Sequence, residues 1–208
     1  SNVLHVVDLS AERRQRAADA DALLQDVFAS AISELNDGKW QGLALVAVGG
    51  YGRAELSPAS DLDVVLLHDP GIGVRDTVQM RQAAQEDYRA ATGMLDARYV
   101  AGDSAIVLAL RAEVLSDWRR DARTRLSELR EASATRVERF GWLAHAAVPD
   151  LKESGGGLRD GVVMRALVAT WLVDVPHAES EELRSALLDV RDALHITSGR
   201  RLEKFDPE

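Results

Sequence analysis

The chain has 208 residues, 46% of them hydrophobic and 28% charged, which is the composition of a soluble globular protein with one sizeable core or two small domains. Its 34 acidic and 25 basic residues give a formal net charge of −9, so we expect no nucleic-acid partner. It has no cysteine and no apolar run near the roughly 18 residues of a membrane span, which suits a cytoplasmic protein with no membrane partner.

Residues 10–36 have the periodicity of an amphipathic helix that packs on a sheet, with Ser10 as its cap and the breakers at 36–38 as its end. The predicted apolar stripe consists of Ala20, Leu23, Leu24, Val27, Phe28, Ala31, Ile32 and Leu35. Nothing in this segment requires a functional role, so we interpret it as scaffold.

Two predicted strands then flank a glycine turn. The apolar run 43–48 stops at the glycines, and a second run, 62–67, has two carboxylates at its start. Because strand side chains alternate, Asp61 and Asp63 are expected on one face. Two negative charges at such a short distance repel each other unless a cation lies between them. Hard oxygen ligands favour Mg²⁺ or Mn²⁺.

The turn itself suits a phosphate. Gly49 and Gly50 have no side chains, so a polyphosphate can approach the backbone, and Arg53 adds a planar cation. The alternative is an ordinary turn beside a solvated strand edge. A P-loop would need Gly-Lys-Ser/Thr, and a dinucleotide fold would need a third glycine and a following helix; neither is present. The combination predicts metal-assisted chemistry on a nucleotide.

A third carboxylate follows a weakly helical segment, 74–91, which we expect Gly93 to close. Residues 94–100 alternate as a third strand, which places Asp96 and Arg98 on one face. We expect Asp96 to join the carboxylates of the neighbouring strand. The alternative is a surface ion pair between Asp96 and Arg98, which would contribute little.

Strand patterns end near residue 103. Helical periodicity then recurs at 105–118, 121–147, 162–171 and 181–196. We therefore predict two domains, an α/β domain over 1–102 and an all-helical domain over 103–208. The His68-Asp69 pair suggests a metal-dependent phosphohydrolase as an alternative, but the other histidines stand singly without metal-ligand spacing.

The segment 149–160 contains three consecutive glycines between two predicted helices, with Lys152 and Arg159 on either side. Basic groups around a glycine loop at a helix N-terminus suit a phosphate or an acidic partner. The alternative is that Asp160 caps the following helix and the glycines form a hinge. The residues alone leave both interpretations open.

At this point the sequence resembles the N-terminal part of the bacterial bifunctional uridylyltransferase/uridylyl-removing enzymes that modify the nitrogen regulator PII. The motifs that carry the resemblance are 49–63, 94–103 and 149–160. The first is shared by the whole nucleotidyltransferase superfamily, and the third is more specific to these enzymes and to the related enzyme that modifies glutamine synthetase. The resemblance spans residues 40–208 and implies a nucleotidyltransferase (polymerase-beta-like) mixed sheet followed by a helical domain.

The resemblance implies transfer of UMP from UTP to a tyrosine of PII, with release of pyrophosphate. Asp61 and Asp63 would hold two Mg²⁺ ions, and Asp96 would complete the metal set and help to deprotonate the attacking hydroxyl. The residues that would receive the triphosphate are Gly49, Gly50, Arg53 and Ser60. Lys152 and Arg159 of the helical domain would close over the nucleotide.

The chain also departs from the family pattern. The segment after the second strand is shortened to 71–75, and Ala54 stands where a glycine is common. The phosphohydrolase and glutamine-sensing domains are absent, so we expect transfer without removal. One alternative is an adenylyltransferase that uses ATP on the same PII target, because no residue distinguishes uracil from adenine. Another is a non-catalytic nucleotide- or protein-binding module, against which the three carboxylates argue.

Overall fold

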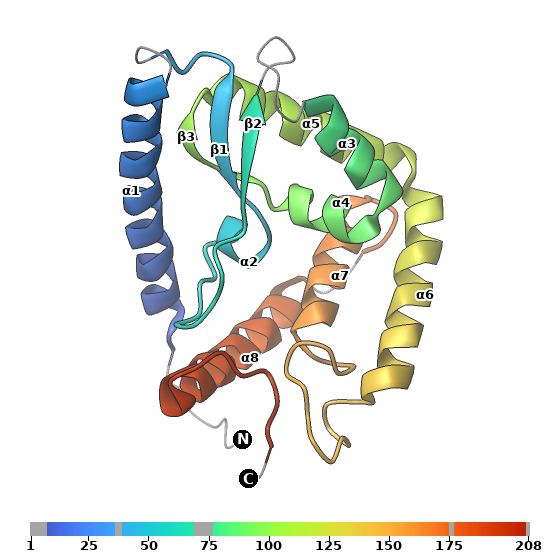
Figure 1. Cartoon of the computed structure of the whole chain (residues 1–208). Coiled ribbons are helices and arrows are strands. Elements are labelled where there is room, and N and C mark those ends of the chain that lie inside the picture. The colour runs from blue at the N-terminus through green and yellow to red at the C-terminus, as the bar shows by residue number, and fades with distance from the viewer. Residues whose placement is uncertain (1–7, 36–38, 69–76, 175–176, 207–208) are drawn as a thin grey trace. The chain divides into compact units, whose positions relative to one another are not determined.

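The computed structural model describes residues 8–35, 39–68, 77–174 and 177–206, which form two compact units (Figure 1). The sheet unit comprises 14–56 and 61–120, and the helical unit comprises the described parts of 1–13, 57–60 and 121–208. The elements in chain order are α1 (Ser10–Leu35), β1 (Leu43–Ala47), α2 (Gly49–Gly52), β2 (Val64–His68), α3 (Thr77–Glu86), α4 (Tyr88–Leu95), β3 (Arg98–Gly102), α5 (Ser104–Arg120), α6 (Ala122–Phe140), α7 (Leu158–Ala169) and α8 (His177–Ser198). The domain boundary placed after residue 102 stays a prediction; α5 groups with the sheet unit.

The sheet unit is an α/β structure, as predicted. Its strands lie in the order β2-β1-β3 and pair antiparallel, so the mixed strand directions that we expected are not found in the described part of the chain. Side chains alternate between two cores. Ala44, Val46 and Leu67 pack with residues of α4 and α5 on one face. On the other face, Ala47 and Val100 lie in a cluster with residues of α1 and α2.

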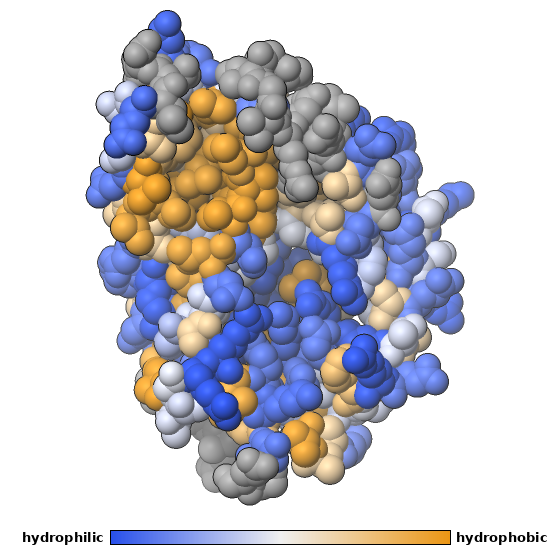
Figure 2. Space-filling model, in the orientation of Figure 1, coloured by the Kyte–Doolittle hydropathy of each residue, from blue (hydrophilic) through white to orange (hydrophobic). Residues whose placement is uncertain are grey.

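Helix α1 keeps part of its predicted apolar stripe exposed. Leu23 and Val27 are 61% and 55% exposed, whereas Ala17, which the stripe omitted, is buried against the sheet. Val64 and Leu66 of the edge strand β2 are also exposed. Figure 2 shows apolar surface gathered over the region of α1 and the strands. The prediction that α1 packs on the sheet is confirmed, but only a narrow part of its stripe makes that contact.

Several predicted boundaries were wrong for local reasons. Ser10 does not cap α1: it is the first helical residue, and its N–H donates to the Asp8 carboxylate at 2.9 Å. Gly93 lies inside α4 rather than closing the segment. Gly141, with φ of +68°, ends α6 before the predicted 147 because a glycine adopts this backbone conformation without strain.

The helical unit contains α6, α7 and α8, with α7 packed against both other helices. Arg13 forms buried ion pairs with Asp189 at 2.7 Å and Asp192 at 3.1 Å, which tie the start of the described chain to α8. Within the described residues, every helix is too short or too polar to cross a membrane. The segments 36–38 and 69–76, which include the predicted end of the first helix and the shortened segment 71–75, lie outside the described residues.

Candidate functional site

Asp61 and Asp63 precede β2 rather than lying on it. The strand begins at Val64, so the argument from strand alternation was wrong for this pair. The backbone nevertheless fixes Asp63, because its carbonyl accepts a hydrogen bond of 3.0 Å from the Val48 N–H at the end of β1. Both carboxylates are exposed. They are therefore accessible to a ligand at the point where β1 ends and β2 begins.

The glycine turn lies beside Asp63, as expected for one site. Residues Gly49–Gly52 form the single helical turn α2, and Gly49 has a φ of +58°, a conformation that favours glycine. A Cβ atom added to Gly49 would lie 3.4 Å from Asp63 Oδ2. At Gly50 the nearest atom to such a Cβ is 3.8 Å away, so this position is more open. The backbone of the turn and the Asp63 carboxylate thus border the same space.

Asp96 lies at this turn, but it is not on the strand where we predicted it. It follows α4 and precedes β3, which begins at Arg98, so it does not share a strand face with Arg98. The Arg53 guanidinium donates to Asp96 at 2.5 Å and to Glu55 at 2.7 Å. Burial alone would lower the pKa of Arg53, but Glu55 and Asp96 raise it overall. Arg53 therefore holds Asp96 at the turn.

The alternative ion pair between Asp96 and Arg98 is also wrong. Arg98 instead forms a two-pronged pair with Asp21 of α1, at 2.6 and 3.0 Å. It also donates to the carbonyls of Tyr51 and Gly52, each at 3.2 Å. Arg98 therefore links α2 to α1.

Asp21 is a positioning residue that sequence reasoning missed. Besides Arg98, it accepts a 2.6 Å hydrogen bond from the Tyr51 hydroxyl, and burial together with this bond raises the pKa of Tyr51. Asp21 lies four residues after Ala17 and three before Leu24, which places it on the packed face of α1. A carboxylate on an apolar helix face needs a partner, and that was the available signal.

The described residues do not hold a ready-made metal cluster. Among them, no group of three or more His, Asp or Glu side chains is arranged to hold an ion. Asp96 is engaged by Arg53, whereas Asp61 and Asp63 are exposed hard-oxygen donors. Mg²⁺ usually binds one or two carboxylates and takes further oxygens from water and substrate phosphates. The donor set at Asp61 and Asp63 fits that mode of binding.

The remaining predicted site residues belong to the helical unit. Ser60 has a buried hydroxyl without a hydrogen bond to any described residue. Lys152 and Arg159 lie side by side, because the Arg159 N–H donates to the Lys152 carbonyl at 3.1 Å. Arg159 also pairs with Glu153 at 2.8 Å. The backbone at Lys152 is thus joined to that at Arg159, and the role of both residues in nucleotide binding stays a prediction.

Two of the three glycines in the loop are tightly packed, which argues against a hinge. A Cβ on Gly157 would lie 2.6 Å from the Leu151 carbonyl oxygen, and one on Gly155 would lie 2.9 Å from the Trp142 ring. Asp160 does not act as the N-cap of α7; its carboxylate accepts from the Gly156 N–H at 2.6 Å. Close approach of the backbone explains why glycines are needed here.

A buried arginine organises that loop. Arg136 of α6 donates to the carbonyls of Glu153 at 2.7 Å and Ser154 at 3.2 Å, and it pairs with Asp160. The predicted helix over 121–147 gave no indication of this role, because Arg136 is one of many basic residues in it. A planar donor with several N–H groups is suited to holding several oxygens at once.

Comparison with known proteins points to one class, enzymes that add and remove uridylyl groups. The chain is 44% identical over 217 residues to the bifunctional uridylyltransferase/uridylyl-removing enzyme of Streptomyces coelicolor, a match that covers 93% of this chain and 25% of that protein. The enzymes of the same name from Mycobacterium tuberculosis and Corynebacterium glutamicum are 38% and 31% identical, over 76% and 80% of this chain. No protein-family model matches the chain.

The chain is therefore a relative of the bifunctional uridylyltransferase/uridylyl-removing enzymes, which confirms the resemblance seen in its motifs. It spans about a quarter of the length of these relatives.

Proposed function

We propose that this chain is a magnesium-dependent nucleotidyltransferase with a polymerase-beta-like fold that transfers UMP from UTP to a tyrosine of PII and releases pyrophosphate. The observation that carries the proposal is the match to uridylyltransferases over 93% of the chain. The exposed Asp61 and Asp63, the second of which lies beside the glycine turn, supply a chemically suitable site. UTP is favoured over ATP because the relatives are named for the uridylyl group.

Asp61 and Asp63 would hold Mg²⁺, or Mn²⁺, together with phosphate oxygens of the nucleotide. When bound, the metal neutralises charge on the phosphates and on the leaving group. Asp96 contributes a third carboxylate near the turn, and its pairing with Arg53 gives it a fixed orientation. We assign Asp96 to proton transfer first and to metal binding second, because Arg53 already occupies one side of its carboxylate.

In the proposed reaction the tyrosine oxygen of PII forms a bond to the α-phosphorus of UTP. The bond from that phosphorus to the bridging oxygen breaks, and pyrophosphate leaves with the electron pair. Asp96 accepts the phenolic proton as general base. Gly49 and Gly50 leave room for the phosphates at the turn, and Arg53 orients Asp96.

Three residues of the helical unit are proposed as phosphate-binding groups. Lys152 and Arg159 provide two adjacent cations, and the buried Ser60 hydroxyl has a hydrogen-bonding capacity that no described residue uses. Cations and hydroxyls of this kind bind phosphate oxygens.

The test is to incubate the chain with Mg²⁺, PII and labelled UTP or ATP, each in a separate reaction. We expect label on PII from UTP. Label from ATP alone would reassign the donor, and label from neither nucleotide would refute the enzyme proposal in favour of a binding module. Asp61→Asn with Asp63→Asn should abolish transfer with an unchanged melting curve. Persistent transfer would show that these carboxylates do not hold the metal.

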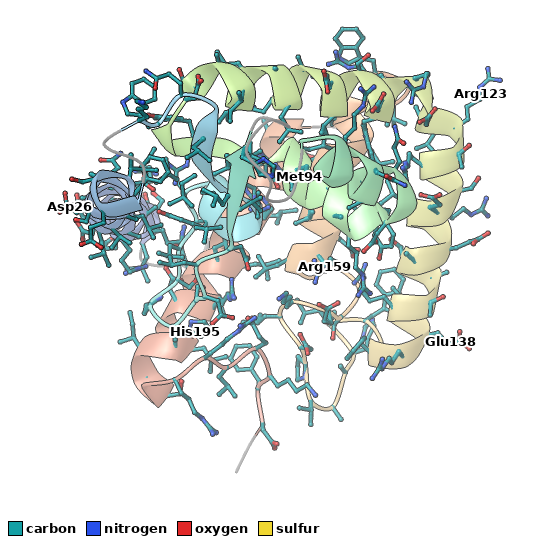
Figure 3. All side chains as sticks on the ribbon, turned by 45° about the horizontal axis from the view of Figure 1, so that its top comes forward. Asp26, Met94, Arg123, Glu138, Arg159 and His195 are labelled. Carbon is teal, nitrogen blue, oxygen red and sulfur yellow. The ribbon has the colours of Figure 1, made fainter. Side chains whose placement is uncertain are left out.

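A matched control removes the same number of charges elsewhere. Asp26 of α1 and Glu138 of α6 are exposed carboxylates, both labelled in Figure 3. The double variant Asp26→Asn with Glu138→Gln should retain transfer at the level of the unmodified chain, because neither residue is assigned to the site.

A further inference from the structure

The segment that follows α8 lies against the Lys152 loop. The Leu151 N–H donates to the Glu203 carbonyl at 2.7 Å, and Asp150 and Lys204 form an antiparallel bridge. Residues 150–152 therefore run beside 203–204 within the helical unit. This pairing brings Lys152 next to Glu203, although the two are far apart in the sequence.

Glu203 forms ion pairs with two arginines. Its carboxylate pairs with Arg191 of α8 at 2.6 Å and with Arg201 at 3.7 Å. On the other side of Lys152, Arg159 pairs with Glu153 at 2.8 Å; Figure 3 labels Arg159 where α7 begins. We define the Lys152 cluster as Lys152, Glu153, Arg159, Arg191, Arg201 and Glu203.

The Lys152 cluster has more positive than negative charge. It contains four cations and two carboxylates, in a chain whose overall formal charge is −9. Lys152 is half-buried beside Arg159 and Glu203. Burial and the nearby Arg159, Arg201 and Arg191 together lower the pKa of Lys152, against the opposing effect of Glu203. A compact anion would relieve this excess charge.

We propose that the Lys152 cluster is a binding site for a phosphate chain, in which Arg191 and Arg201 join Lys152 and Arg159. This assignment rests on the proposed function, which supplies a nucleoside triphosphate as the source of such a chain. Arginine forks and a lysine point charge around one half-buried position match the many oxygens of a di- or triphosphate better than the single carboxylate of an acidic side chain. Glu203 positions both arginines and limits their mutual repulsion.

The test measures binding of inorganic tripolyphosphate to the full chain by calorimetry, with EDTA present so that no metal contributes. Lys152→Gln and Arg201→Gln should each weaken binding by about 10-fold, the loss expected for one charged hydrogen bond. Arg200→Gln is the matched control, because Arg200 is exposed like its neighbour Arg201 but lies outside the cluster. It should change binding less than about 2-fold, as expected for a surface charge.

Equal losses for the two adjacent arginine variants would overturn the site in favour of a diffuse charge effect. Failure of tripolyphosphate to bind, or tighter binding of a hexaglutamate peptide, would overturn it as well. Displacement of tripolyphosphate by UTP would support a nucleotide as the source of the phosphate chain. Displacement by inorganic phosphate but not by UTP would oppose it. The Asp61→Asn, Asp63→Asn variant should bind tripolyphosphate as the unmodified chain does. Phosphate binding by the unmodified chain, without transfer to PII from either nucleotide, would refute only the proposed function.

Discussion

The Gly52 position offers the sharpest test of how α2 is held against Asp96. A Cβ atom at Gly52 would lie 2.3 Å from the Asp96 carbonyl oxygen and 3.0 Å from the Ala47 carbonyl oxygen. Both obstacles are backbone atoms, so no side-chain rotation can relieve the contact. In Gly52→Ala the turn must therefore move away from Asp96, or the segment after α4 must move away from the turn.

The size of the effect follows from that distance. The contact is about 0.7 Å closer than 3.0 Å, below which Cβ contacts essentially never occur. Overpacking of this kind typically costs about 1–3 kcal/mol, and a backbone obstacle places Gly52→Ala near the upper end, at about 2–3 kcal/mol. That loss corresponds to a fall in Tm of roughly 5–10 °C for a chain of this size. If Asp96 acts as proposed, displacement of the turn also lowers kcat by as much as about 100-fold.

The assay is thermal unfolding of Gly52→Ala beside Gly50→Ala, which lies in the same helical turn. The first atom that a Cβ meets at Gly50 is 3.8 Å away, so this control should be neutral or up to about 1 kcal/mol more stable. Two variants with the same Tm would refute the close approach of α2 to Asp96. A destabilised Gly52→Ala with unchanged kcat would keep the packing argument and remove Asp96 from the reaction.

Three further predictions concern residues whose contacts stabilise each unit separately. Asp21→Asn should lower the free energy of unfolding by about 1–3 kcal/mol in urea titrations, because it weakens bonds to two part-buried donors, whereas the exposed Asp26→Asn on the same helix should be neutral; equal effects would contradict this role. Arg136→Lys should speed amide hydrogen exchange at 155–157, since an ammonium cannot hold the same oxygens, and unchanged exchange would oppose the arginine's role in the loop. Hydrogen bonding from Arg81 lowers the pKa of Asp117 from 3.8 to about 2, so the stabilisation by the Asp117 carboxylate is present above pH 4 and is lost as the pH falls toward 2. The difference in unfolding free energy between wild type and Asp117→Asn should vanish over that range, and a constant difference would refute the linkage.

The sequence predicted the presence of most elements, because long periodic segments and glycine turns leave strong local signals. The helix α1, the strand β1 and the helices α5 and α8 lie close to where the periodicity placed them. The positions of Asp61, Asp63 and Asp96 relative to the strands were not predicted correctly. Strand ends are set by hydrogen bonds to a partner strand, and the sequence of one strand does not show where that pairing stops.

Long-range partners were the other part of the site that sequence could not supply. Asp21 meets Tyr51 and Arg98 only because α1 packs on the face of the sheet that carries α2. Arg191 reaches the Lys152 loop only through the bridge between residues 150 and 204. Each contact depends on tertiary packing between segments distant in the chain, for which local patterning carries no information.

The stretch 49–63 therefore combines two kinds of residue that the motif alone does not distinguish. Gly49 and Asp63 border the accessible space at the end of β1, and the nearby Asp61 in the chain is exposed, so these residues suit a ligand. Arg53 faces inward, where its buried charge requires the two carboxylates that Glu55 and Asp96 provide. Arg53, which the sequence suggested as a phosphate ligand, thus forms structural ion pairs with Glu55 and Asp96. Arg53→Lys should accordingly disturb the orientation of Asp96 before it affects nucleotide affinity, so kcat should fall more than KM rises; a rise in KM alone would restore Arg53 to the triphosphate.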